Sequence, residues 1–332
     1  RAKAKAIGSG VGSAVYDGLT GPLAGFSESV LQRGFSPSAL ESLAGCPMQY
    51  FLRYALELEA HSSPLEPGSL ARDLKGRLYH EALRGLYEHV FVNGNDGSVA
   101  EARRFLGRYF NSGLGGTYGL YPLVWKSLAA AMVERILKLW ENDAASRGNF
   151  RPASFERAAE AASRCGFNVH GRIDRLDIDE AEKIVRVVDY KTSVKKRPSS
   201  AEKLLSSGKI FQPFFYLELA NALFIKEGFR AREAVFLGLE DENGKDGAAP
   251  IQAFTAADAE LSAEAVCSTA KLLASLAAEG RFFIRPDMGE QKRCDWCDYG
   301  SICRNRHGLS VARAADSASS TGLSEEEDDA VA

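Results

Sequence analysis

The sequence predicts an α/β fold in which helices flank a short mixed sheet, with a helical lobe inserted before the sheet. Helical periodicity dominates the chain up to about residue 147, two neighbouring segments then alternate as β-strands, and the remainder returns to helix, strand and helix. This order of elements favours helices packed against one sheet. The chain has 332 residues, 45% of them hydrophobic, so it can build a core without a metal to hold it together.

Ordered structure is expected to begin at Ser36. Residues 1–34 are rich in Gly, Ala and Ser, which is typical of a linker or a peripheral arm. Ser36 can cap a helix that has Pro37 at its first position, where the missing N–H costs nothing. The Cys46-Pro47 pair then interrupts this helix, and Pro47 can open a second one, so Cys46 is expected at a fixed helix junction.

Two helical regions follow. The pattern over residues 70–89 is helical, and the inserted lobe at 98–147 is mainly helical, with a Gly-rich break at 113–119. One face of the first region carries polar residues at i, i+3 and i+7. These residues are Arg77, His80 and Arg84.

The period then changes to that of a β-hairpin. Residues 167–178 alternate well enough for a strand, 184–190 are strongly β, and the acidic segment 179–182 provides the turn between them. The elements expected after the hairpin are a helix over 210–225, a strand over 234–239 and a long helix over 256–278.

Two acids and a lysine lie on the predicted hairpin. Asp174 is near the middle of the first strand and Asp189 near the end of the second, so antiparallel pairing brings them to one region of the sheet. Two such carboxylates can bind Mg²⁺ or Mn²⁺ through oxygen. Lys191 shares the face of Asp189 and can orient or deprotonate an attacking water. An Asp-x-Lys tripeptide also fits an exposed ion pair, but Val187 and Val188 before it indicate a buried strand.

Three further polar residues allow a functional and a plain interpretation. His80 on an amphipathic helix is more often an ordinary polar-face histidine, although its company with Arg77 and Arg84 suits a metal-facing or phosphate-facing role. Gln212 and Tyr216 are spaced i, i+4 and can position a DNA strand. They equally fit a helix that packs an aromatic side chain against the sheet.

Four of the six cysteines are spaced as metal ligands. Cys294, Cys297 and Cys303 form a C-x-x-C-x₅-C pattern, which can wrap one metal centre but leaves a ligand position open. Cys46 is the natural fourth ligand, because the other two cysteines lie in a predicted strand and a predicted helix with no partner nearby. The spacing leaves a Cys₄ zinc site and an iron–sulfur cluster both open. Because the sequence shows no signal peptide, its six cysteines also favour a reducing compartment, and metal ligation over disulfides.

Neither the net charge nor the chain ends determine which kind of partner the protein binds. The formal charge is −3, and the five acids at 325–329 lie in a C-terminal segment, 307–332, that is expected to be a disordered acidic tail. The remainder is close to neutral and can still carry a basic groove. No apolar run is long enough to predict a membrane span. The start lacks Met and a signal-peptide core, which indicates an excised fragment or the tail of a longer polypeptide.

Several motifs resemble those of one family. Residues 171–177 (Gly-Arg-Ile-Asp-Arg-Leu-Asp) and 188–192 (Val-Asp-Tyr-Lys-Thr) resemble motifs II and III of the PD-(D/E)XK nuclease superfamily, in its RecB-like exonuclease branch. Residues 36–54 resemble the opening of that nuclease domain, 76–83 its histidine motif and 212–216 its Gln-x-x-x-Tyr motif. The resemblance covers about residues 35–306 in the family's order. It implies a restriction-endonuclease-like core in a nuclease domain over 35–306, with the insertion at 98–147.

The resemblance also implies roles for the site residues. Asp174 and Asp189 would bind Mg²⁺ or Mn²⁺, Lys191 would be catalytic, and His80 would assist at the metal, with the Tyr190 carbonyl as a further ligand. The residues that would meet substrate DNA are Gln212, Tyr216, Arg77 and Arg84.

The cysteine pattern resembles the iron–sulfur nuclease domains of AddB-type helicase–nuclease subunits and of CRISPR-associated nucleases in the same superfamily. It implies a [4Fe–4S] cluster on Cys46, Cys294, Cys297 and Cys303, which would staple the N- and C-terminal segments together. The cluster's role would be structural, because it closes a long loop of the chain.

The function implied is a Mg²⁺-dependent deoxyribonuclease, an exonuclease on single-stranded DNA that serves DNA repair and recombination in the cytoplasm, at the nucleoid. A helicase is the implied partner, and this sequence contains no G-x-x-x-x-G-K-[ST] phosphate loop of its own. One alternative is a non-catalytic DNA-binding or scaffold module, which would be expected to have lost Asp174, Asp189 or Lys191. Another is a free-standing CRISPR-type nuclease, for which this chain is bulky.

Overall fold

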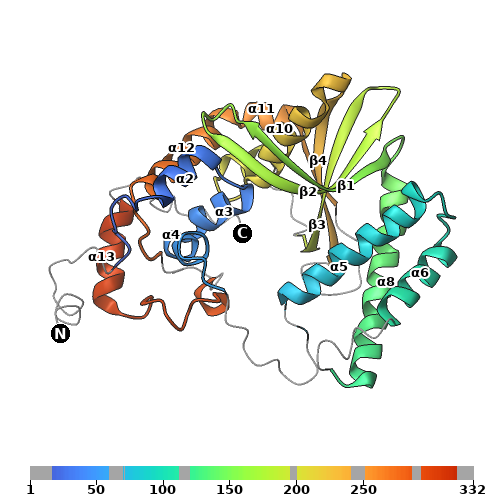
Figure 1. Cartoon of the computed structure of the whole chain (residues 1–332), viewed down its shortest axis with the longest axis horizontal. Helices are drawn as coiled ribbons and strands as arrows, with labels where there is room; N and C mark the ends of the chain where they lie inside the picture. The colour runs from blue at the N-terminus through green and yellow to red at the C-terminus, as the bar shows by residue number, and fades with distance from the viewer. Residues whose placement is uncertain are drawn as a thin grey trace.

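The structure, a computed structural model, describes residues 17–59, 70, 72–111, 120–194, 200–240, 251–285 and 293–319. The strands in these residues are β1 (Arg151–Ala162), β2 (Asn168–Asp179), β3 (Ile184–Ser193), β4 (Arg230–Glu240) and β5 (Ile251–Thr255). They form one sheet in the order β1-β2-β3-β4-β5 (Figure 1). Only the β3–β4 pair is parallel among them, so the sheet is mixed, as the sequence predicts.

The predicted hairpin is confirmed as β2 and β3. Arg175 pairs with Val188 and Asp179 with Ile184, in an antiparallel register around the expected turn. Alternation along β3 sends Val187 into the core on one face of the sheet and Val188 into the core on the other. Asp189 and Lys191 therefore lie on the Val187 face.

Two strands, β1 and β5, are not predicted from the sequence. β1 pairs with β2 along almost its whole length, from Arg151 opposite Ile178 to Ala162 opposite Asn168. Its sequence is rich in Ala, Glu and Arg, which favour helix. Pairing with a buried neighbour decides the conformation here, because strand preference depends mainly on such contacts.

One face of the sheet is covered by helices from both halves of the chain (Figure 1). These helices are α2 (Phe26–Arg33), α3 (Pro37–Gly45), α9 (Ala201–Ser206), α10 (Gln212–Phe224), α11 (Ala256–Leu261) and α12 (Ala263–Ala278). The predicted cap of α3 is confirmed, since the Ser36 side chain accepts a hydrogen bond from the Ala39 N–H at 3.2 Å. The single helix expected over 256–278 is instead two, which meet at Ser262.

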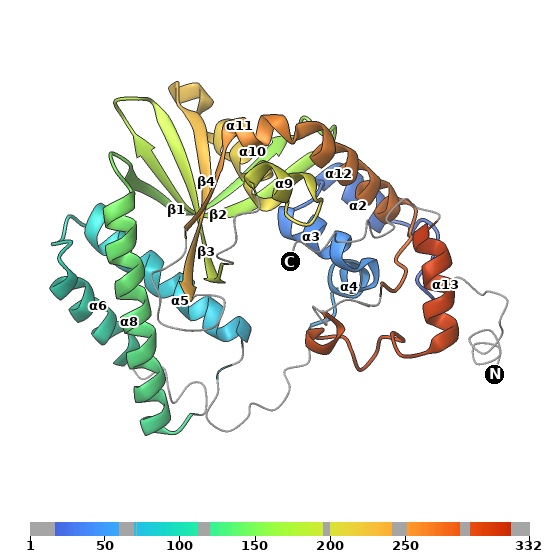
Figure 2. The same ribbon diagram turned by 180° about the vertical axis from the view of Figure 1, so that it is seen from behind.

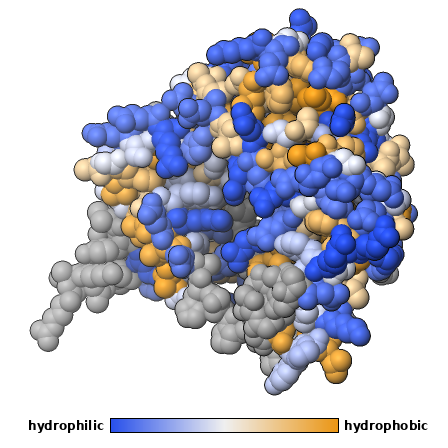
Figure 3. All heavy atoms as spheres, turned by 45° about the vertical axis from the view of Figure 1, so that its right-hand side comes forward, coloured by the Kyte–Doolittle hydropathy of each residue, from blue (hydrophilic) through white to orange (hydrophobic). Residues whose placement is uncertain are grey.

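The opposite face packs against the helical insertion. Helices α5 (Arg72–Tyr87), α6 (Val99–Asn111) and α8 (Pro122–Ser146) share a second core with β3 and β4. Figure 2 shows these helices and strands from behind. The side of the molecule that carries α6 and α8 is covered mainly by hydrophilic side chains, with scattered hydrophobic ones (Figure 3). The predicted Gly-rich break at 113–119 lies outside the described residues.

The described ends of the chain pack on the domain. Helix α2, within the segment expected to be a linker or peripheral arm, packs on α12. Helix α13 (Gly308–Ser319) begins where the disordered tail is predicted to begin, so the expectation of disorder from residue 307 is wrong over this helix. Asp17 is buried and accepts a 2.5 Å hydrogen bond from Arg313 Nε. Residues 1–16 and the acidic run at 325–329 lie outside the described residues.

Two cysteines depart from the sequence prediction. Cys165, in the β1–β2 connection, forms a disulfide with Cys267 on α12 across a sequence separation of 102 residues. The expectation of metal ligation over disulfides is therefore wrong for this pair. The cysteines approach only in the folded chain, so their sequence spacing carries no signal. None of the described helices combines the length and the hydropathy needed to cross a bilayer.

Candidate functional site

The site is built where β1, β2 and α5 meet. His80 on α5, Glu156 on β1 and Asp174 on β2 place one potential ligand atom each within 4.8 Å of the others. His80 Nδ1 lies 3.2 Å from Asp174 Oδ2. One imidazole and two carboxylates offer the nitrogen and oxygen donors that divalent metals take in hydrolytic sites.

Glu156, on β1 before the predicted hairpin, is the member of this group that is not among the site residues expected from the sequence, and Glu160, further along β1, is exposed. The backbone of Glu156 has φ of 47°, and this residue has no partner in the β1–β2 ladder although Phe155 and Arg157 on either side do. A left-handed residue inside a strand is strained and turns its side chain out of register. Burial and the nearby Asp174 charge raise the pKa of Glu156.

The peptide groups of Tyr190 join β3 to this cluster. The Tyr190 N–H donates to Asp174 Oδ2 at 3.0 Å, and His80 Nε2 lies 3.1 Å from the Tyr190 carbonyl oxygen. Both ring nitrogens of His80 therefore face acceptors, which suits the doubly protonated ring. Burial lowers the pKa of His80, but the hydrogen bond and charge of Asp174 outweigh it, so the pKa is raised.

Asp189 and Lys191 stand beside the cluster, on the face that packs against α10. Asp189 is 5% exposed, and Lys191 Nζ lies 2.7 Å from its Oδ2. That oxygen is buried and has no hydrogen bond of good geometry, so it has coordination capacity to spare. Burial, together with the Asp174 charge, raises the pKa of Asp189 to about 6 against the opposing charge of Lys191.

Gln212 and Glu41 connect this pair to α10. Lys191 Nζ donates to Gln212 Oε1 at 2.5 Å. Glu41, on α3, accepts from the backbone N–H groups of Phe211 and Gln212 at 2.8 and 2.9 Å. Its carboxylate thus caps the start of α10, where no local side chain does. Sequence reasoning misses Glu41, because its partners are about 170 residues away along the chain.

The remaining residues predicted to contact the substrate differ in their exposure to solvent. Tyr216 is 6% exposed and forms a hydrogen bond with Gln212, and burial raises the pKa of its hydroxyl. Arg77 and Arg84 are exposed on α5, and Arg84 Nε lies 4.0 Å from Glu88 Oε1. Arg172, which pairs with Glu156 at 3.1 Å, is also largely exposed. Arg172 and Arg84 therefore lie near enough to Glu156 for their charges to act on it, while the contact of all three arginines with DNA stays a prediction.

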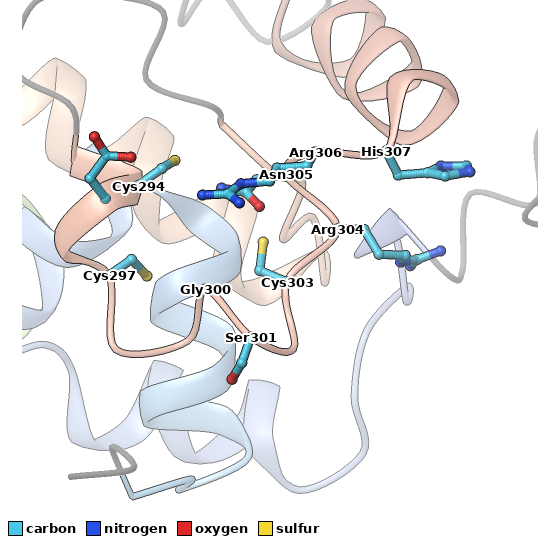
Figure 4. A pocket seen from close by; sticks show the side chains of 10 residues that line it. Cys294, Cys297, Gly300, Ser301, Cys303, Arg304, Asn305, Arg306 and His307 are labelled. Carbon is cyan, nitrogen blue, oxygen red and sulfur yellow. The ribbon is translucent and has the colours of Figure 1, made fainter. Parts of the chain in front are cut away.

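The four predicted ligand cysteines gather at a separate place. Cys46, at the junction of α3 and α4 (Pro47–Tyr50), lines one pocket together with Cys294, Cys297 and Cys303. Figure 4 shows the sulfur atoms of Cys294, Cys297 and Cys303 pointing into a common space. All four thiols are free. Ends of the domain almost 250 residues apart in sequence therefore meet at one set of sulfur atoms.

The donor chemistry suits a positively charged centre, although the expected cluster itself is not shown. Burial first, and then the neighbouring thiols, raise the pKa of Cys303 to about 11, and the pKa of Cys297 is raised for the same reasons. A bound cation offsets that penalty, because it favours thiolates. Among the described residues, however, the four cysteines do not draw together as closely as the His80 group does.

One family model and two known proteins are similar to this chain. Residues 34–304 match the family model of the PD-(D/E)XK nuclease superfamily. Over 197 residues the chain is 28% identical to one of the subunits of an ATP-dependent helicase/deoxyribonuclease from Moorella thermoacetica. That stretch is 50% of this chain, and the chain spans 16% of the length of that relative. A solved structure of a presumed exonuclease from Eubacterium rectale is similar over 80% of this chain and 89% of its own, with a TM-score of 0.46 and 11% identity. A likeness at that level carries no argument.

Proposed function

This chain belongs to the PD-(D/E)XK nuclease superfamily, and from that premise we propose that it is a metal-dependent DNA nuclease that hydrolyses phosphodiester bonds. The observation that carries the proposal is the meeting of His80, Glu156 and Asp174 within 4.8 Å, next to the Asp189–Lys191 pair. Acids, an imidazole and a lysine at one sheet edge fit metal-assisted hydrolysis better than a structural ion-pair network.

The cation would be held by Asp174, Asp189, His80 and the Tyr190 carbonyl, with Glu156 added to the set that the sequence suggests. Mg²⁺ or Mn²⁺ suits these mostly oxygen donors. When bound, the ion polarises a phosphate oxygen and lowers the pKa of a coordinated water. His80 must lose a proton to serve as a ligand, since both its nitrogens face acceptors in this arrangement.

Lys191 and Gln212 would act on the nucleophile. The Lys191 ammonium is fixed between Asp189 and Gln212, at 2.7 and 2.5 Å, so its position relative to the acids is set before any substrate arrives. From there it can orient the attacking water and offset the negative charge that develops on phosphorus. Glu41 supports this geometry, because it holds the first residues of α10.

The proposed substrate is single-stranded DNA, delivered by a helicase. The exposed arginines Arg77, Arg84 and Arg172 can contact phosphates, while Gln212 and Tyr216 guide the strand near the acids. A helicase partner is supported by the name of the Moorella thermoacetica relative, which is part of a helicase/deoxyribonuclease. In that setting the protein would serve DNA repair and recombination.

We further propose that Cys46, Cys294, Cys297 and Cys303 hold a [4Fe–4S] cluster with a structural role. A single zinc ion would bring its four sulfur ligands to about 3.8 Å from one another, given Zn–S bonds of about 2.3 Å. The four thiols line one pocket but do not gather as closely as a single ion would require. That arrangement suits a larger centre.

The test is digestion of end-labelled single-stranded DNA by the wild type and by Asp174→Asn, with Mg²⁺ and with EDTA. We expect Mg²⁺-dependent cleavage by the wild type and a loss of at least about 100-fold in the variant, because one charged ligand is removed. Unchanged DNA binding by the variant, measured by fluorescence anisotropy, separates chemistry from binding. Binding without any cleavage by the wild type would instead support the non-catalytic scaffold alternative.

A further inference from the structure

A buried charge cluster lies behind the proposed metal site, between the sheet and the helical insertion. It consists of two acids and two arginines, Asp143 on α8 and Arg175, Asp177 and Arg186 on the hairpin, all at most 5% exposed at the side chain. Arg175 donates to Asp177 through Nε at 2.8 Å and to Asp143 through Nη2 at 2.9 Å. Arg186 Nη2 donates to the same two acids at 2.8 and 3.1 Å.

Arg175 is the centre of this cluster, and one of its guanidinium nitrogens donates to a group outside the two acids. Its side chain is fully buried, and the guanidinium lies 4.2 Å from the centre of the Tyr87 ring. Two of its nitrogens are committed to the acids. The third, Nη1, donates to the Tyr190 hydroxyl at 3.0 Å. A planar guanidinium with its nitrogens fixed in this way cannot rotate, so it determines where the Tyr190 hydroxyl lies.

Tyr190 carries this constraint from the charge cluster to the proposed metal site. Its side chain lies in the core beside the insertion, while its backbone N–H orients Asp174 and its carbonyl oxygen meets His80 Nε2. The ring also packs edge-on against the His80 ring, with centroids 5.8 Å apart. One residue thus joins the charge cluster to two of the proposed metal ligands.

We propose that Arg175 is a positioning residue for the metal site, acting through the Tyr190 hydroxyl to fix the peptide groups that orient Asp174 and His80. The inference rests on the proposed function, since it assigns a role toward the cation held there. It also gives the helical insertion a purpose in the reaction, because Asp143 on α8 is what holds Arg175 from behind. Groups that hydrogen-bond to metal ligands commonly govern affinity for the ion.

The competing explanation is that the cluster only attaches the insertion to the sheet. Tyr87 provides the comparison, because it is a second buried tyrosine with its hydroxyl on the same cluster. It donates to Asp143 Oδ2 at 2.6 Å. Its ring lies beside that of Tyr190, with centroids 6.3 Å apart, but none of the hydrogen bonds described for it reaches Asp174 or His80. Removing either hydroxyl takes one hydrogen bond from the buried cluster, although Asp143 Oδ2 also accepts from Arg147 Nη1 at 3.2 Å. Of the two hydroxyls, the one on Tyr190 is connected to the proposed metal site.

The experiment compares Tyr190→Phe with Tyr87→Phe in the full chain. Mn²⁺ binding is measured by electron paramagnetic resonance on anaerobically purified protein stripped of divalent metal. We expect about 10-fold weaker binding in Tyr190→Phe and unchanged binding in Tyr87→Phe, although the Tm should fall in both because each loses a buried hydrogen bond. Cleavage should show the same split, with a higher Mg²⁺ concentration for half-maximal rate in Tyr190→Phe and a kcat that recovers at saturating Mg²⁺.

A second measurement needs neither metal nor activity. Hydrogen–deuterium exchange of the peptide covering 186–193, in metal-free protein, should be faster in Tyr190→Phe and unchanged in Tyr87→Phe. Equal Mn²⁺ affinity and equal exchange in the two variants would overturn the positioning role. A wild type that binds no Mn²⁺ and cleaves nothing would instead defeat the proposed function, and the exchange comparison would still decide whether Arg175 fixes this backbone.

Discussion

Asp189 shows at the level of one side chain how the proposed catalytic site opposes stability. Its carboxyl group is almost fully buried, and burial together with Asp174 raises its pKa from 3.8 to about 6. A carboxyl with a higher pKa in the folded state binds protons more tightly when folded, so the folded state loses stability as pH rises from about 4 through 6. A cation at the site would relieve this penalty, because it favours the ionised form.

We therefore expect Asp189→Asn to be more stable than the wild type above pH 6 in EDTA, although it should be inactive. Between pH 5 and pH 8 the wild type should lose roughly 1 kcal/mol of unfolding free energy relative to the variant. Urea titrations at each pH measure this difference. Glu160→Gln, which alters an exposed acid on β1, gives the baseline. A difference in unfolding free energy between Asp189→Asn and the wild type that stays constant with pH would contradict the raised pKa of Asp189.

Sequence reasoning reaches individual residues only where their spacing is local. Asp174, Asp189 and Lys191 are close along a hairpin, and alternation alone predicts which of them share a face. Glu156 and Glu41 cannot be predicted in this way, because one depends on a left-handed residue inside a strand and the other on a helix start far along the chain. Such roles are properties of the packed molecule and leave no local pattern.

At the scale of elements, the hairpin and the helices around it follow from periodicity, whereas the sheet edges do not. The helices α3, α5, α8 and α10 and the strands β2 and β3 coincide with expected segments. The strand β1 has helix-favouring composition and is a strand because β2 pairs with it. The disulfide between the β1–β2 connection and α12 is equally invisible in sequence, since it joins two elements that meet only after folding.

That disulfide should stabilise the attachment of α12 to the sheet. It closes a loop of about 100 residues, for which the chain-entropy account gives about 4.7 kcal/mol, whereas disulfides typically contribute about 2–4 kcal/mol. We expect a thiol reductant to lower the Tm of the wild type and to leave a Cys165→Ser/Cys267→Ser double variant unchanged at the lower value. The Tm values are compared by differential scanning calorimetry under argon, which protects the other four cysteines. Equal sensitivity of both proteins to reductant would show that the bond is not what the reductant acts on.

Across the whole molecule, an ion pair and a group of cysteines are among the contacts that hold late residues of the described chain onto early ones. Arg313 on α13 pairs with the buried Asp17, and the cysteines of the C-terminal loop face Cys46 between α3 and α4. Both attachments bring late residues onto early ones, so they close the chain around the sheet. The sequence predicts the cysteine attachment from one cysteine early in the chain and three closely spaced ones near its end. The ion pair has no such sequence signature, because its partners are 296 positions apart.

If the four thiols hold the proposed cluster, its loss should loosen the domain as a whole. Anaerobically purified protein is expected to be brown and to contain about four iron atoms per chain. Cys297→Ser should lose that colour and iron and unfold at a lower temperature, because the loop that the centre closes spans nearly the entire domain. Cys165→Ser is the matched control, since it removes a cysteine that lies in the disulfide, and it should keep its iron. A colourless wild type loaded with zinc would show that the cysteines form a single-ion site and hold no cluster. A metal-free wild type of unchanged stability would show that they hold no metal centre.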